Sequence, residues 1–378
     1  MAISSAAFSV FVYYQKSYTT GQLKSEMYEN VRGVVELMAQ EIGQAGLVTL
    51  PAARPTLSAG VTASVSAQTA TVSSTTSMFV GEKLIVDTGA NEEVVTLTGV
   101  VPASNQIGAI FNVNHATGAP INVQGVFPYG IVTPGTTNGS TGTSTGSYTT
   151  TVTEPANSVL NMFGDINGDG TLVYVRYTCN TNTTPGTLSR SVTTISPGNN
   201  TISTSQTLLN TLVTNPGGTA CFQYTTQQVS YSQTVGTGTG SQTAFSTTMG
   251  NIPVGASSVS VSAGAVTGTD NGSGSITGTG ISSGTINYAT GALSVTFSSA
   301  PASGTAITAA YRGQSLVTNI ALTLSVRTLY RDPQSRQYLT MTKSFLNLAP
   351  RNILTALKLA NASVTNRLQP TPANVLLY

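Results

Sequence analysis

The sequence predicts an α+β fold in which a long N-terminal α-helix carries a β-rich head with two inserted all-β modules. Three observations predict it. The first 47 residues have the apolar spacing of one helix, the remainder is rich in Gly, Ser and Thr, and that remainder alternates apolar and polar residues in short runs. The expected segments are a helix (1–50), a β module (51–131), a low-complexity loop (132–156), the first part of a core sheet (157–227), a second β module (228–313), and the rest of the sheet with a tail (314–378).

The N-terminal helix is expected to face two different environments. Residues 1–14 are almost wholly apolar or small, and the chain becomes amphipathic from Gln15. Beyond that point apolar residues recur at three- and four-residue steps, which places them on one face: Leu23, Met27, Val31, Val34, Met38 and Ile42. Gly46 stands where a C-terminal cap is expected. An apolar N-terminal helix in front of a polar β head is typical of a filament subunit.

Strands are predicted where apolar and polar residues alternate between turn residues. Residues 80–87 and 92–97 read as two strands around a turn, and residues 285–297 read as strand, Gly turn and strand. Stronger strands are expected at 320–326 and 337–342, and a short helix at 352–359. The segment 132–156 has too few apolar residues to offset the entropy lost on ordering, so an exposed loop is expected there.

Several strings carry a family resemblance. They are Met1–Ser4, Tyr14–Tyr18, and above all Glu26–Gly46, which contains the pattern N-x-R-x-x-x-x-x-M-x-x-(D/E)-I-x-x-A-G. Two later segments, Leu172–Tyr177 and Val326–Thr328 with Pro333–Tyr338, add to them. Together they resemble the type IV pilin superfamily, and most closely the PilW-like minor pilins of the type IV pilus, over about half of the chain.

The resemblance implies a pilin-type head and a non-enzymatic subunit of an extracellular filament. The helix would be anchored in the inner membrane before assembly and would then pack against other pilin subunits, in a homo- or hetero-polymer. Residues for that packing in the filament core are Phe8, Phe11, Leu23, Met27, Val31, Val34, Met38 and Ile42. The head would be displayed for adhesion or surface contact. For the aromatic residues near the N-terminus, ordinary helix packing is favoured over an electron conduit.

The start of the chain departs from the family pattern. The short basic leader, the cleavage site and the glutamate of the mature N-terminus are missing, so Met1 is expected to lie inside the family's helix, through a late start codon or a shortened chain. The apolar run is shorter than the about 20 residues that cross a bilayer. It also lacks the basic region of a cleavable secretory signal.

Charge is scarce and unevenly distributed. Charged residues make up 7% of the chain, which is common in secreted β proteins and rare in cytosolic enzymes. Residues 1–93 carry 5 Lys/Arg and 8 Asp/Glu, whereas residues 312–378 carry 8 Lys/Arg and only Asp332. The basic C-terminal part could contact the acidic helix of a neighbouring subunit, DNA or the cell envelope, or could simply be solvated.

The two cysteines, Cys179 and Cys221, are expected to form one disulfide, as an isolated pair does in an exported chain. Closing that loop would stabilise the fold by about 4 kcal/mol. Metal binding or redox catalysis is less favoured, because no C-x-x-C spacing is present.

A calcium loop is the sharpest candidate for a bound ion. Residues 165–170 fit the first half of a D-x-N-x-D-G loop, in which Asp165, Asn167, Asp169 and the Thr171 carbonyl would supply oxygen ligands. Arg176 occupies the position of the bidentate glutamate, so the segment is not an EF-hand. The alternative is a plain turn stabilised by Asp and Gly residues.

No catalytic pattern emerges. His115 is the only histidine and lies in a loop-like context, and neither a G-x-S-x-G elbow nor a phosphate-binding loop occurs at a strand–helix junction. The alternatives to a minor pilin are therefore a principal filament subunit, a DNA-uptake pilin, a type II secretion pseudopilin and, least favoured, a glycan-binding or hydrolytic module. Possible calcium is the single expected cofactor.

Overall fold

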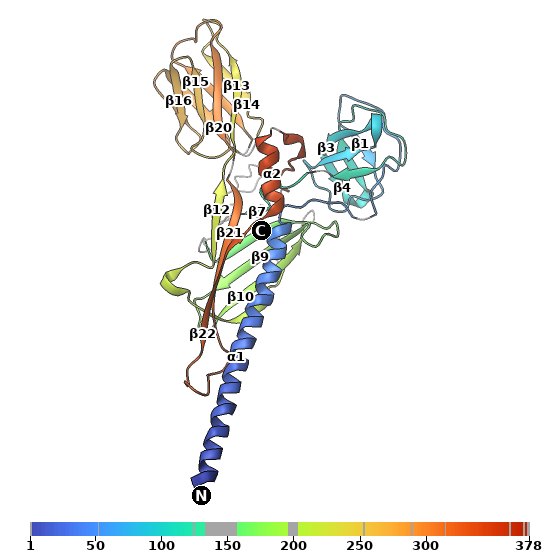
Figure 1. Ribbon diagram of the computed structural model, residues 1–378. Helices are drawn as coiled ribbons and strands as arrows, with labels where there is room; N and C mark the ends of the chain where they lie inside the picture. The colour runs from blue at the N-terminus through green and yellow to red at the C-terminus, as the bar shows by residue number, and fades with distance from the viewer. Residues whose placement is uncertain are drawn as a thin grey trace.

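The fold is built around one long helix and one curved sheet (Figure 1). A computed structural model describes residues 2–51, 53–123, 125–132, 157–195, 203–251, 254–288, 290–313, 315–362, 364–372 and 375 of the 378-residue chain. Helix α1 (Ala2–Gln44) is continuous over 43 residues and protrudes from the rest of the molecule at its N-terminal end. The helix predicted from the first 47 residues is therefore confirmed.

The C-terminal end of α1 is closed by the predicted glycine. Gly46 has a φ of +81°, the left-handed conformation that an L side chain rarely adopts, and an added Cβ would lie 2.7 Å from the Phe127 carbonyl oxygen. The last carbonyls of α1 also receive the side-chain amide of Asn352, which donates to the Gln44 oxygen at 3.1 Å. That asparagine belongs to α2 (Arg351–Asn361), so the second helix caps the first.

The central sheet is an eight-stranded antiparallel half-barrel with the order β12-β21-β11-β10-β9-β8-β7 and with β22 paired to β21. Its strands are β7 (Ile131–Val132), β8 (Val159–Gly164), β9 (Val173–Asn180), β10 (Gly186–Thr194), β11 (Gln206–Val213), β12 (Phe222–Gln227), β21 (Leu316–Arg327) and β22 (Thr340–Leu348). A disulfide between Cys179 and Cys221 joins β9 to the start of β12, which confirms the predicted pairing.

The main core lies between the two helices and this sheet. Alternation along β9 shows how the sequence defines the two faces: Val175, Tyr177 and Cys179 pack toward α1, whereas Tyr174 joins a separate cluster with Phe127 and Phe163 on the other side. Met38 and Ile42 of α1 and Ile353 of α2 are fully buried in the main core. The sheet therefore holds the C-terminal half of α1 by its apolar face.

The first β module has its own core. It contains two three-stranded sheets, β1-β5-β4 and β3-β2-β6. Their strands are β1 (Gln68–Thr71), β2 (Lys83–Val86), β3 (Glu93–Thr96), β4 (Gly99–Val101), β5 (Gln106–Ala109) and β6 (Ile121–Val123), with 3₁₀ turns at Gly89–Asn91 and Pro102–Ser104. Leu84, Ile107, Phe111 and Ile121 are fully buried between the sheets. The strands predicted at 80–87 and 92–97 correspond to β2 and β3.

The second β module is a sandwich of a five-stranded sheet, β13-β20-β15-β16-β17, and a three-stranded sheet, β14-β19-β18. Its strands are β13 (Ser230–Thr237), β14 (Ala244–Thr248), β15 (Ser260–Ala263), β16 (Val266–Asp270), β17 (Ile276–Thr277), β18 (Ile281–Ile286), β19 (Ala292–Phe297) and β20 (Ala306–Arg312). The predicted strand–turn–strand at 285–297 corresponds to the end of β18 and to β19, which pair at Ile286 and Leu293.

Each module leaves and rejoins the rest of the chain through neighbouring segments. Leu47, before the first module, forms a bridge with Val126, after it. At the second module Ser230 pairs with Arg312, and just before this point Gln227 pairs with Leu316. We call this second two-stranded connection the neck. In Figure 1 the two modules lie at the end of the molecule away from the free end of α1.

The predicted fold class, an α+β fold with a pilin-type head, is wrong. The chain is β-rich, its sheet curls into a half-barrel, and a second helix, α2, packs at the C-terminal end of the long one; this is not the pilin fold. Short sequence strings predict local segments. The curvature of the sheet and the order of its strands arise from long-range pairing that no local string specifies. The loop predicted at 132–156 lies, apart from Val132, outside the described residues.

Candidate functional site

The free N-terminal half of α1 is the most unusual surface of the molecule. None of residues 7–22 is buried, and the first buried residue of the helix is Leu23. Large side chains nevertheless cover this half: Phe8, Val10, Phe11, Tyr13, Tyr14 and Tyr18 are each more than half exposed. A contiguous exposed apolar and aromatic surface is characteristic of an interaction site. We call residues 7–22 the free half of α1.

The aromatic residues of the free half follow helical spacing. Phe8, Phe11, Tyr14 and Tyr18 succeed one another at steps of three, three and four residues, so they form a stripe along one face. No charged residue occurs before Lys16. No described helix is both long enough and apolar enough to span a membrane. The stripe therefore presents aromatic side chains in the arrangement in which helices contact one another.

The second half of α1 has a different role from the one expected. Leu23, Met27, Val31, Met38 and Ile42 were predicted to pack in a filament core, but the structure buries all five within this chain, the last four of them in the main core. Val34 is partly buried against the same core. Of the eight predicted helix-packing residues, Phe8 and Phe11 alone belong to the free half. The other six have partners within this chain, and packing in a filament core stays a prediction for them.

A buried polar cluster fixes the second half of α1 to the sheet. The Glu41 carboxylate accepts a hydrogen bond from the Tyr177 hydroxyl at 2.5 Å and pairs with the guanidinium of Arg190 on β10, whose Nε lies 3.1 Å away. Burial, together with the nearby Glu41 charge, raises the pKa of Tyr177 far above its usual range, so the phenol remains a donor. These three residues were not found from the sequence, because they are far apart in the chain.

The hairpin between β21 and β22 contacts α1 where the free half ends. The Thr20 hydroxyl donates to the Asp332 carboxylate, which also accepts the Ser335 N–H at 2.7 Å. These donors, led by Thr20, lower the pKa of Asp332 to about 2. About two helical turns further on, the Lys343 ammonium lies 4.4 Å from the centre of the Tyr28 ring. This contact marks the side of α1 that faces β22.

The candidate calcium loop forms a turn closed by its own donors. The Asp165 carboxylate is buried and accepts the N–H groups of Asp169 and Gly170, both at 3.0 Å, and the Thr49 hydroxyl. Asp169 accepts the Thr171 N–H, and Asn167 and Asp169 are exposed. Both Asp165 oxygens are thus taken by the protein, so the four residues as arranged do not form an open cation shell.

Calcium binding stays a prediction, and titration of the intact chain tests it. A rise in the unfolding temperature on adding calcium, reversed by a chelator, would support it; an unchanged temperature would support the plain turn. Across the described part of the chain, no group of three or more His, Cys, Asp or Glu side chains is arranged to hold a metal ion.

The single histidine is a structural link in the first module. His115 Nδ1 lies 3.2 Å from an Asp87 oxygen and Nε2 lies 2.8 Å from a Glu93 oxygen, with the ring side chain fully buried. Glu93 also accepts the Asn112 N–H at 2.9 Å. The Thr88 N–H and then His115 lower the pKa of Asp87. Because both ring nitrogens are bonded and solvent is excluded, this histidine joins its own loop to Asp87 after β2 and to Glu93 of β3, and does not present a base to a substrate.

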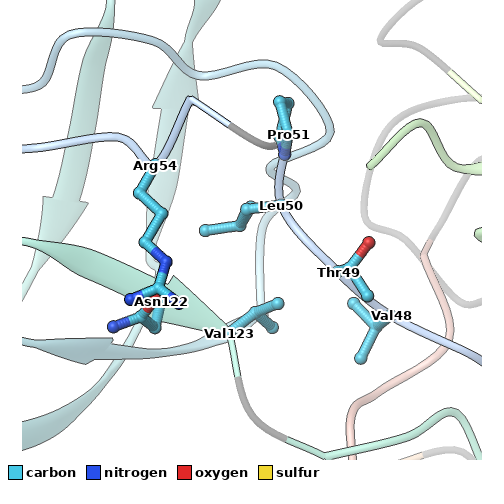
Figure 2. Close-up of a pocket in the computed structure, with 7 residues that line it drawn as sticks. All are labelled: Val48, Thr49, Leu50, Pro51, Arg54, Asn122 and Val123. Carbon is cyan, nitrogen blue, oxygen red and sulfur yellow. The ribbon is translucent and has the colours of Figure 1, made fainter. Parts of the chain in front are cut away.

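A shallow pocket of about 320 Å³ lies where the chain leaves α1 for the first module (Figure 2). Its wall is formed by Val48, Thr49, Leu50, Pro51, Arg54, Asn122 and Val123. Arg54 is the one charged side chain among them, and Figure 2 shows it beside Asn122. With no second titratable group in its wall, the pocket offers no set of residues for acid–base or nucleophilic chemistry.

Comparisons with known proteins identify no relative. No family model and no curated protein matches this chain. Comparison with solved structures returns a chain described as "Complete structure of manganese lipoxygenase of Gaeumannomyces graminis and partial structure of zonadhesin of Komagataella pastoris", at 9% identity over 81% of this chain and 83% of that chain. Its TM-score of 0.10 carries no argument about fold or function.

Proposed function

We propose that this protein is a non-enzymatic structural subunit of a pilus-like extracellular filament, in which the free half of α1 packs against the helices of neighbouring subunits. The N-terminal sequence resembles that of type IV pilins, so the filament we propose is of the type IV pilus kind. One observation carries the proposal: a segment with an aromatic stripe and a single charged residue, Lys16, projects from the molecule as a continuation of a firmly held helix.

The physical chemistry of the free half favours association. Fully burying a large apolar side chain contributes about 1.5–3 kcal/mol to a contact, before the costs of association are subtracted. An isolated helix is only marginally stable in water. Packing against partner helices would shield the free half from water and stabilise it. The buried polar cluster at Glu41 holds the helix base in place, so less conformational entropy is lost on binding.

The rest of the molecule is consistent with exposure outside the cell. A disulfide is present, which persists in oxidising compartments, and the head keeps its solubility through hydroxyl and amide groups rather than charge. The two β modules lie away from the free half of α1 and would face outward for adhesion or surface contact. Anchoring in the inner membrane before assembly belongs to the same proposal.

Electron microscopy of filaments sheared from cells that express the chain, with mass spectrometry of their subunits, tests the proposal. The intact chain is expected in the filaments, along their length for a principal subunit or at their ends for a minor one. Phe11→Ser with Tyr14→Ser is expected to abolish incorporation, whereas the control Val65→Ser with Val101→Ser removes exposed apolar side chains from the first module and should not. Absence of the wild-type chain from all filaments would refute the proposal.

A further inference from the structure

The connection between β21 and β22 carries an exposed cluster of arginine and aromatic side chains. We call residues 327–340 the hairpin tip. Arg327 and Arg331 lie with their guanidinium carbons 4.2 Å and 5.5 Å from the centre of the Tyr338 ring. Arg336, Leu329 and Tyr330 are exposed beside them. Tyrosine and arginine are the residue types most enriched at the energetic centres of protein interfaces.

The positive charge of the hairpin tip is not neutralised within the described chain. Its single acid, Asp332, stays ionised while it accepts hydrogen bonds from Thr20 and Ser335, so three arginines and one carboxylate leave the tip with a net charge of +2. None of the guanidinium groups of Arg327, Arg331 and Arg336 forms an ion pair with a described carboxylate. In a chain with only 15 Lys and Arg residues, three unpaired arginines in one loop are a strong local concentration of charge.

The chain also carries a matching acidic surface. Four described carboxylates, those of Glu36, Glu41, Asp87 and Glu93, each face a cationic or histidine side chain. Glu26 and Glu29 are different, because both are exposed on α1, lie one turn apart, and form no ion pair with the described residues. We call this pair the acidic face of α1.

The hairpin tip and the acidic face cannot meet within one subunit. Tyr28 contacts Lys343 of β22 and so marks the side of α1 that carries the hairpin. At 3.6 residues per turn, Glu26 and Glu29 point about 160° and about 100° away from Tyr28 round the helix. The two surfaces also differ in level: Thr20 touches the tip, and Glu26 and Glu29 lie about 9–14 Å further along the axis at 1.5 Å per residue.

Complementary surfaces on opposite sides of a subunit, offset along its axis, form a heterologous contact that repeats from copy to copy and builds an open helical filament. We propose that the hairpin tip of one subunit binds the acidic face of α1 on the next copy of this chain, with an axial stagger of about 9–14 Å. This inference rests on the proposed function and adds to it the contact that sets the spacing between subunits. The aromatic stripe holds neighbouring helices together. The contact between the hairpin tip and the acidic face sets the position of one subunit along the next.

A second copy fits the hairpin tip better than a nucleic acid does. Nucleic-acid surfaces present basic residues as an extended patch or stripe. Here the nearest further cation, Lys343, already lies over Tyr28, and the exposed neighbours are Leu329 and Tyr330. Apolar and aromatic side chains around arginine are typical of the buried part of a protein–protein contact.

The experiment exchanges the charges of the two surfaces in the intact chain. The chain is kept in detergent, and assembly on removal of the detergent is measured by pelleting. Arg331→Glu with Arg336→Glu is expected to raise the concentration needed for assembly roughly tenfold at low salt, since like charges then face each other. Adding Glu26→Arg and Glu29→Arg to the same chain should restore assembly. The matched control, Arg54→Glu with Arg351→Glu, changes the same charge at exposed arginines elsewhere and should assemble as the wild type does.

Contact is read directly by mixing a chain with Arg331→Cys and a chain with Glu29→Cys. An intermolecular disulfide should form, and Glu92→Cys in place of Glu29→Cys should give none; the native cysteines are already paired. Normal assembly by the Arg331→Glu, Arg336→Glu chain would overturn the inference and leave the proposed function standing. Failure of the wild type to assemble would overturn both. Loss of duplex DNA binding in that variant, with assembly unchanged, would overturn the inference in favour of a nucleic-acid ligand.

Discussion

Residues 7–22 and residues 23–44 of α1 form one continuous helix, yet they meet opposite environments. The second half has apolar residues on one side and buries them against the half-barrel, with Glu41 fixed by Tyr177 and Arg190. The first half has large side chains around much of its circumference and buries none of them. Continuity of a helix is thus no guide to its partners. The distribution of apolar residues around it separates a half that folds the head from a half that is available to other molecules.

The largest expected effect compares a truncation in each half. Met38→Ala should lower the free energy of unfolding by about 3 kcal/mol, because it leaves a cavity in the main core. Phe11→Ala removes a larger side chain, yet should leave that free energy unchanged, since Phe11 is 63% exposed. Urea unfolding of the intact chain in detergent measures both. Equal losses would show that the free half of α1 is held by the head after all.

A smaller effect is expected at the polar cluster. Arg190→Ala should cost about 2 kcal/mol, because Glu41 would keep its buried charge with only the Tyr177 hydroxyl beside it; Arg190 is partly exposed, which reduces the usual cost of breaking a buried pair. Arg190→Lys should recover part of the loss. The control is Arg32→Ala on the exposed side of the same helix, where the Arg32–Glu36 pair is open to water and no measurable change is expected. A similar loss for both alanine variants would argue against the cluster.

The smallest effect concerns the boundary between the halves and depends on pH. The pKa of Asp332 is lowered to about 2 in the folded protein, below its ordinary value of 3.8, so the charged carboxylate favours the folded state. The stabilisation from this contact should be present above pH 3.8 and should fade as the pH falls toward 2. Thr20→Val should shift the pKa of Asp332 upward in an NMR titration, because Thr20 is the leading donor. An unchanged pKa would show that the hairpin tip does not depend on α1.

The sequence predicted the elements that depend on local patterns. The apolar spacing of α1, the left-handed Gly46 that ends it, strands β2 and β3 and the Cys179–Cys221 pair all follow from composition and spacing. The helix, its glycine cap and the two strands depend on residues close in sequence. The disulfide was predictable because the chain has two cysteines, which leaves one possible pair.

What failed depends on distant residues. The fold class was wrong because the curvature of the sheet and the docking of α2 on α1 follow from pairing across hundreds of residues. The link from His115 to Asp87 and Glu93 was missed for the same reason, since no spacing rule joins a histidine to acids 28 and 22 residues earlier. The helix periodicity showed which face is apolar, but it could not distinguish burial by the chain's own sheet from burial by another subunit.

The neck of the second β module has an evolutionary consequence. Its two strands enter and leave side by side, with Ser230 opposite Arg312 and, just below, Gln227 opposite Leu316. Paired strands lie about 4.8 Å apart, so a short turn could rejoin the chain after excision of residues 230–312 without moving β12 or β21. The sandwich is therefore an exchangeable cassette. During evolution another domain could replace the sandwich and change what the surface presents. The supporting sheet and the long helix would stay as they are.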